Sequence, residues 1–205
     1  MSNTLTEIAK RLCLDKGTAP TETMPWHAAF PDHRTMGYTT IYEHYMEPLR
    51  HAPCRLLEVG VCDQRFPLGS LKMWREYAPE WRLTAMDFFV GHARGQEAFY
   101  AEQIANMGIH LTIGDQARTE TYSRLPNEPF NFIIEDGSHI EAHMLFSLQM
   151  LLPRLSVGGF YFMEDIDAKA PTTAAFLDKL EEFPELVKIW LSPCKLSYLA
   201  VFQRR

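Results

Sequence analysis

The sequence of 205 residues contains only four cysteines, and no two of them form a CxxC pair. Cys13, Cys54, Cys62 and Cys194 are widely separated, which disfavours a zinc site built from paired cysteines. Reduced thiols are the simplest interpretation of such cysteines, and they are typical of proteins that work in the cytoplasm. We therefore expect a cytoplasmic protein without a disulfide framework.

Blocks of lysine and arginine are also missing, and the formal net charge is −6. Nucleic acid is therefore disfavoured as the main partner. No stretch is long and apolar enough to span a membrane, and the N-terminal MSNTLTEIAKRLCLDKG lacks the apolar core of a signal peptide. With 46% apolar and 22% charged residues, the chain reads as globular and is long enough for one full hydrophobic core.

Apolar periodicity predicts strands and helices that alternate along most of the chain. We expect strands at 54–60, 81–87, 109–115, 130–136, 158–165, 185–192 and 196–203. We expect helices at 4–14, 38–49, 70–79, 92–108, 118–125, 139–155 and 172–183. Five successive strand–helix repeats predict a Rossmann-like, doubly wound α/β sheet with helices on both faces. The last two strands are separated by a short turn, which predicts an antiparallel hairpin at one end of a seven-stranded sheet.

Acidic residues fall at or next to the carboxyl end of each of the first five predicted strands. They are Glu58, Asp87, Asp115, Asp136 and Asp165. Any single one could merely cap the helix that follows it. Because doubly wound sheets bind ligands in the crevice at the carboxyl ends of their strands, five acids in register predict a shared ligand site.

Two nucleotide-binding motifs are absent, and their absence narrows the choice of ligand. There is no GxGxxG fingerprint, which argues against NAD, and no GxxxxGK[ST] loop, which argues against ATP. Gly60 lets a ligand approach the backbone closely, and Asp87 stands where nucleotide-binding sheets grip ribose hydroxyls. Asp115 and Gln116 could meet an adenine edge. An adenosine ligand without a pyrophosphate fits best, and S-adenosylmethionine (SAM) is such a ligand.

Several stretches carry a resemblance to a known family. They are LDKG followed by GYTTIYEHYMEPLR, LLEVGVCDQRFPLGSLKMWREYAP, the GDQ after the third strand, IIEDGSH and GGFYFMEDI. Together they resemble class I SAM-dependent methyltransferases, and more narrowly the metal-dependent macrolide-sugar O-methyltransferases of the macrocin and mycinamicin type. The resemblance extends from about residue 15 to residue 166. It implies transfer of a methyl group to a hydroxyl of a small molecule.

The resemblance also implies a role for individual residues. It places the cofactor against Glu58, Gly60, Ser70, Asp87, Asp115 and Gln116. It implies that Asp136, Glu164 and Asp165 hold Mg²⁺, an ion that prefers oxygen ligands, and that His139 is the general base. The chain departs from the family pattern at Cys62-Asp63, where glycines are usual, and at Leu68-Gly69-Ser70, where a double glycine usually precedes the serine.

Other interpretations stay open on the sequence alone. A metal-independent or non-catalytic SAM-binding protein would fit the departure in the cofactor loop. A metal-dependent hydroxylase or hydrolase could use the same acids.

We divide the chain into an N-terminal helical or lid segment, 1–50, and a SAM-binding domain, 51–205. We interpret His27 and His33 as loop residues, with a place in the wall of the acceptor pocket as the alternative. Trp26, Phe30 and Tyr38 either form an aromatic lid or pack the segment onto the domain. The sequence does not fix the identity of the acceptor. It does not fix the oligomeric state either, and a homo-oligomer is one alternative.

Overall fold

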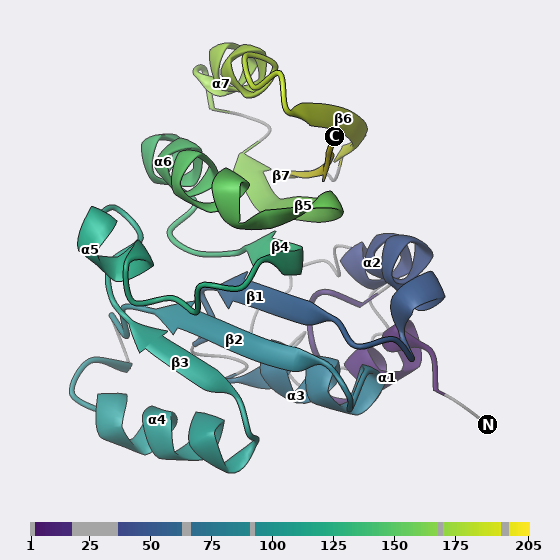
Figure 1. Ribbon diagram of the computed structural model, residues 1–205, viewed down its shortest axis with the longest axis vertical. Coiled ribbons are helices and arrows are strands. Elements are labelled where there is room, and N and C mark those ends of the chain that lie inside the picture. The colour runs from purple at the N-terminus through teal and green to yellow at the C-terminus, as the bar shows by residue number, and fades with distance from the viewer. Residues whose placement is uncertain (1–2, 18–36, 63–66, 91–92, 168–169, 194–196) are drawn as a thin grey trace.

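Seven strands form one mixed sheet, in the order β3-β2-β1-β4-β5-β7-β6, in the computed structural model of the chain (Figure 1). The structure describes residues 3–17, 37–62, 67–90, 93–167, 170–193 and 197–205. The strands are β1 (Arg55–Val59), β2 (Arg82–Asp87), β3 (His110–Ile113), β4 (Phe130–Glu135), β5 (Leu155–Asp167), β6 (Leu186–Pro193) and β7 (Ser197–Arg204).

The pairing of the strands confirms the predicted fold class. β1 pairs in parallel with β2 and with β4, and the parallel set continues to β3 on one side and to β5 on the other. β7 is antiparallel to both β5 and β6. The predicted hairpin therefore closes one end of the sheet, and the carboxyl ends of β1 to β5 lie along a single edge.

Helices cover both faces of this sheet. Buried side chains of α1 (Leu5–Arg11), α2 (Tyr38–Met46), α3 (Gly69–Tyr77) and α4 (Glu97–Asn106) join one hydrophobic cluster. Those of α5 (Thr119–Tyr122), α6 (Glu141–Leu151) and α7 (Thr173–Leu180) join the other. Short 3-10 turns follow α2 at Glu47–Leu49 and α6 at Leu152–Arg154. No helix in the described part of the chain is long and apolar enough to cross a membrane.

Local backbone conformation explains where the observed helices differ from the predicted ones. Thr4 caps α1 in a capping box with Glu7, and the helix ends shortly before Cys13, which has a φ of 59°. α6 begins two residues later than predicted, because His139 adopts a left-handed φ of 55° that no right-handed helix can contain. α4 begins at Glu97, and the start of the predicted helix at residue 92 lies outside the described residues.

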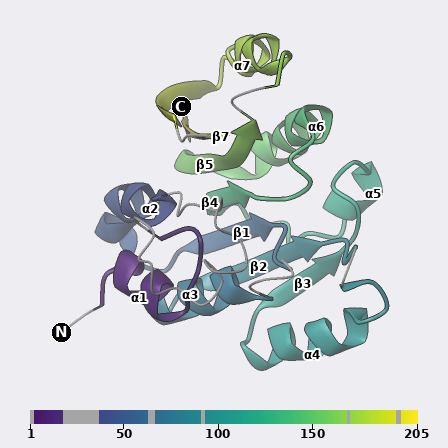
Figure 2. The same ribbon diagram turned by 180° about the vertical axis from the view of Figure 1, so that it is seen from behind.

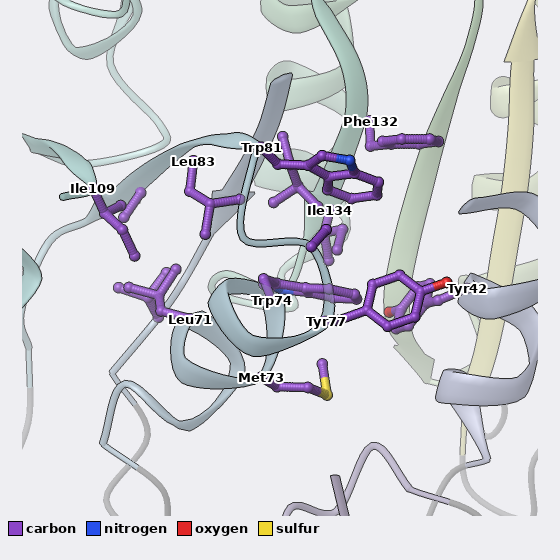
Figure 3. Close-up of a cluster of buried hydrophobic side chains, with 14 of the residues drawn as sticks. Tyr42, Leu71, Met73, Trp74, Tyr77, Trp81, Leu83, Ile109, Phe132 and Ile134 are labelled. Atoms are coloured by element: carbon purple, nitrogen blue, oxygen red, sulfur yellow. The ribbon is translucent and has the colours of Figure 1, made fainter. Parts of the chain in front are cut away.

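Aromatic side chains fill the core on the side of α2 and α3 (Figure 3). Trp81 stacks on Phe132 of β4 with ring centroids 5.0 Å apart, and Tyr42 meets Trp74 edge to face at 5.4 Å. Such pairs contribute packing energy beyond the area that they bury. Tyr42 comes from the N-terminal segment, so that segment shares its core with the sheet.

The predicted boundary near residue 50 stays a prediction, although the two parts share this core. Figures 1 and 2 show α1, α2 and α3 lying together beside the sheet from both sides. Trp26, His27, Phe30 and His33 lie outside the described residues. In the part that the structure describes, Cys13, Cys54 and Cys62 carry thiols and are not joined in disulfides.

Candidate active site

A cavity of about 420 Å³ opens at the carboxyl ends of the parallel strands. This volume lies in the range of small-molecule and cofactor sites. All predicted site residues except Glu58 line it, and they are Gly60, Ser70, Asp87, Asp115, Gln116, Asp136, His139, Glu164 and Asp165. The strand order brings these side chains together from segments that are far apart in the sequence.

Gly60 lies where the ends of β1 and β4 come closest. Its φ is +81°, and a Cβ built there would lie 2.0 Å from the carbonyl oxygen of Asp136. Its backbone N–H donates to the carbonyl of Met86 at 2.8 Å. Only glycine fits both the conformation and the space, so Gly60 lets the turn after β1 pack directly against the backbone that follows β4, at the wall of the cavity.

Asp87 ties together the loops that follow β1 and β2. Its Oδ2 accepts from the backbone N–H groups of Val61 at 2.7 Å and Cys62 at 3.0 Å. Its Oδ1 accepts from the N–H of Phe89 at 2.6 Å. The carboxylate therefore shapes the cavity wall as well as facing the cavity.

Glu58 lies behind the cavity wall and is fully buried. Its Oε2 accepts from the indole N–H of Trp74 at 3.1 Å. Burial raises the pKa of Glu58 to about 7, and the positive charge of Lys16 opposes that rise. The side chain is thus a buried acid whose charge depends on pH near neutrality.

Gln116 faces inward, and it organises the segment between β4 and α6. Its Nε2 donates to Glu135 Oε1 at 2.9 Å, and its Oε1 accepts from the N–H of Ser138 at 2.7 Å. Both ends of the Gln116 amide are therefore bonded to other protein groups, next to Gly137 and Ser138. Asp115 lies at the cavity, and its Oδ1 accepts from the N–H of Ala117 at 2.8 Å.

Asp136, His139 and Asp165 form a compact cluster. One ligand atom from each lies within 4.8 Å of the other two, and His139 Nε2 is 3.6 Å from Asp136 Oδ1. His139 and Asp165 both have left-handed φ angles, of 55° and 53°. Such backbone strain in non-glycine residues concentrates at functional sites. Two carboxylates at this separation fit a divalent cation, and the His139 imidazole lies within reach of the same position.

Glu164 turns away from this cluster toward the N-terminal segment. Both of its oxygens accept from Lys16 Nζ, at 2.7 and 2.6 Å, and Oε1 also accepts from the hydroxyl of Tyr42. Burial and the nearby Asp136 raise the pKa of Glu164, and the Lys16 ammonium opposes this rise. The structure therefore places Glu164 beside the cluster, with its oxygens already engaged.

Three residues of this site were missed by reasoning from the sequence. Lys16 bridges two acids, Tyr42 donates to Glu164, and Tyr38 donates to Asp165 Oδ1 at 2.8 Å. The sequence indicates for Tyr38 only an aromatic lid or packing of the N-terminal segment onto the domain. The one available signal was their presence in LDKG and GYTTIYEHY, two of the stretches that carry the family resemblance.

Comparison with known proteins identifies relatives among the enzymes that methylate sugars of natural products. The chain is 36% identical over 134 residues to 8-demethyl-8-(2-methoxy-alpha-L-rhamnosyl)-tetracenomycin-C 3'-O-methyltransferase of Streptomyces olivaceus, a match that covers 63% of this chain. It is 31% identical over 134 residues to mycinamicin VI 2''-O-methyltransferase of Micromonospora griseorubida. The matches cover 32% and 31% of those two relatives, so the chain spans about a third of their length. No protein-family model matches the chain.

Solved structures confirm the methyltransferase fold. MycE methyltransferase of the mycinamycin biosynthetic pathway, in complex with Mg and SAH, superposes with a TM-score of 0.71 at 21% identity. That match covers 100% of this chain and 55% of MycE. CalS11, a TDP-rhamnose 3'-O-methyltransferase of calicheamicin biosynthesis, gives a TM-score of 0.58 at 17% identity, covering 98% and 92% of the two chains. The resemblance to class I methyltransferases that the sequence motifs carry is confirmed.

Proposed function

We propose that this chain, which resembles natural-product sugar O-methyltransferases in sequence and has their fold, transfers a methyl group from SAM to a hydroxyl of a small molecule. A sugar of a natural product, or a related compound, is the acceptor class that the relatives favour. One observation carries the proposal: the Asp136–His139–Asp165 cluster lines a cavity that is large enough for a cofactor. The proposal includes no nucleic-acid or membrane partner. A reducing, cytoplasmic setting would fit the thiols of the described cysteines.

The cofactor residues form the part of the cavity beside β1, β2 and β3. Gly60 would let the amino-acid end of SAM approach the backbone, with Ser70 beside it and Glu58 behind the cavity wall. Asp87 would accept hydrogen bonds from the ribose hydroxyls. Asp115 and Gln116 would lie near the adenine, with Gln116 acting through the backbone that it positions.

The acids at the ends of β4 and β5 would hold Mg²⁺. Asp136, Glu164 and Asp165 supply the carboxylates, and bound Mg²⁺ would supply a Lewis acid that lowers the pKa of an acceptor hydroxyl and orients it. His139 takes the proton of that hydroxyl at a ring nitrogen, since an imidazole is a base suited to neutral pH. The acceptor oxygen forms a bond to the methyl carbon as the carbon–sulfur bond breaks. The products are the methyl ether and S-adenosylhomocysteine.

Methyl transfer measured by mass spectrometry, with SAM and a panel of glycosylated natural products, tests the proposal. We expect a product heavier by one methylene on at least one sugar-bearing acceptor, loss of turnover in EDTA and recovery with added Mg²⁺. His139→Ala should lower the rate by roughly 10²–10⁴ while leaving SAM binding intact. Asp136→Asn should raise the Mg²⁺ concentration required.

A non-catalytic SAM-binding protein is the second candidate, favoured by Cys62 where related proteins usually carry glycine. Cys62 lies in the loop whose backbone N–H groups Asp87 holds. SAM binding by calorimetry without methyl transfer to any acceptor would favour this candidate. Methyl transfer in EDTA at the full rate would instead show that the acid cluster holds no metal during the reaction.

A further inference from the structure

The Lys16 ammonium lies between two acids that come from neighbouring strands. Its Nζ donates to Asp136 Oδ2 at 2.5 Å and to the two oxygens of Glu164 at 2.7 and 2.6 Å. Lys16 is only 7% exposed. Burial opposes its charge, yet Asp136 and Glu164 raise the pKa of Lys16 well above its usual value. The ammonium is therefore a permanent positive charge inside the acid cluster.

The backbone around Lys16 fixes the position of this charge. The carbonyl of Lys16 accepts from the N–H of Thr39 at 3.0 Å, and the carbonyl of Gly17 accepts from the N–H of Gly37 at 2.9 Å. Lys16 and Gly17 are thereby tied to the start of α2. Leu14 is buried in the same core. The backbone hydrogen bonds fix the position of Lys16, whereas a surface lysine that pairs with an acid usually has a mobile side chain.

Two tyrosines of α2 orient the acids near the carboxyl end of β5. Tyr38 and Tyr42 are four residues apart and so share one face of the helix. Tyr38 donates to Asp165 Oδ1 at 2.8 Å, and Tyr42 donates to Glu164. The ring of Tyr42 is anchored against Phe162 at 4.9 Å, in the core that Figure 3 shows. The N-terminal segment thus supplies one cation and two hydroxyl donors to the acids.

We infer that Lys16 is a positioning residue that competes with a divalent cation for Asp136 and Glu164. This inference rests on the metal site of the proposed function. A metal ion that binds Glu164 must share its oxygens with the Lys16 ammonium, since both of them accept from that group. Two cations that share one set of carboxylates also repel each other at short range. Lys16 therefore holds the acids in place without an ion, and it weakens the binding of one.

Binding of Mn²⁺ to the protein, without SAM or acceptor, measures this competition directly. Electron paramagnetic resonance counts free Mn²⁺ at each step of a titration of wild type, Lys16→Met and Lys16→Gln. We expect the Kd for Mn²⁺ to fall at least tenfold in both variants, because the competing charge is gone. Glutamine can still donate to the acids, so Lys16→Gln separates the charge from the hydrogen bonds. Lys10→Met removes an exposed lysine from α1 and should change the Kd less than twofold.

Thermal unfolding in EDTA and in Mn²⁺ gives a second readout. In EDTA, Lys16→Met should unfold at a lower temperature than wild type, because the buried Glu164 and the half-buried Asp136 lose their cation. Mn²⁺ should raise its Tm more than it raises that of wild type, since tighter binding stabilises the folded state further.

The outcomes separate the inference from the proposed function. Equal or weaker Mn²⁺ binding in both Lys16 variants, with binding retained by wild type, overturns the inference alone. No Mn²⁺ binding by any of these proteins overturns it together with the metal site. Normal Mn²⁺ binding and competition, combined with no methyl transfer, leave the inference standing and count against the enzymatic activity.

Discussion

Glu58→Gln should make the protein more stable relative to wild type as the pH rises through neutrality. Glu58 is fully buried, and burial raises its pKa to about 7 from an ordinary value of 4.5. A raised pKa in the folded state means that Glu58 favours folding when protonated. That contribution is fully present below about pH 4.5 and is lost as the pH rises through about 7.

The size of the effect follows from the difference between the two pKa values. Each unit corresponds to about 1.4 kcal/mol, so the contribution lost between pH 4.5 and pH 8 is roughly 3 kcal/mol. Glutamine has nearly the same shape and stays neutral, and its amide oxygen can still accept from Trp74. Glu58→Gln should therefore resemble wild type near pH 4.5 and exceed its free energy of unfolding by roughly 3 kcal/mol near pH 8.

Urea denaturation at one-unit steps of pH, with EDTA present throughout, measures this difference. Glu80→Gln, at an exposed position, controls for the loss of a carboxylate as such. The relevant quantity is the change with pH in the variant-minus-wild-type difference, because other buried acids affect both proteins. A difference that stays constant from pH 4.5 to pH 8 would refute the reasoning, since it would mean that the pKa of Glu58 is the same in the folded and unfolded states.

Three further substitutions test other parts of the structure. Gly60→Ala should lower the free energy of unfolding by roughly 3 kcal/mol or more, measured by urea denaturation, because its Cβ would collide with the Asp136 carbonyl; a loss below 1 kcal/mol would contradict the close approach. Asp87→Asn should weaken SAM binding by about ten- to a hundredfold in calorimetry, since a charged acceptor is lost, and an unchanged Kd would remove Asp87 from the ribose site. Tyr42→Phe should cost roughly 1.5–3 kcal/mol of stability by removing a donor to Glu164, and a Tm equal to that of wild type would speak against that bond.

Most of the fold could be predicted because its determinants are local and periodic. Each central strand is an apolar run that ends on a glycine or an acid, and each helix has an apolar face. The proximity of Asp136 and Asp165 could be predicted, because the carboxyl ends of parallel strands lie at the same edge of a sheet. Asp136 directly follows β4, and Asp165 lies near the end of the neighbouring strand β5.

Other features depend on contacts that no local pattern encodes. Lys16 reaches Glu164 across 148 positions, and nothing in the periodicity of either segment relates them. The inward direction of the Gln116 amide depends on Glu135 and Ser138, which belong to other elements. The late start of α6 depends on a single backbone angle at His139. Side-chain direction and backbone strain are set by the assembled structure, so the sequence alone places a residue at the site without showing what it contacts.

The bond between Lys16 and Glu164 also bears on the order in which the chain can fold. During synthesis Lys16 leaves the ribosome long before β5 does, and contacts between such distant residues are slow to form. Until β5 joins the sheet, α1 and α2 would have to bury an ammonium that lacks Glu164 as a partner. Docking of the first two helices should therefore be a late step, and protection of their amides from hydrogen exchange should appear only after the central strands are protected.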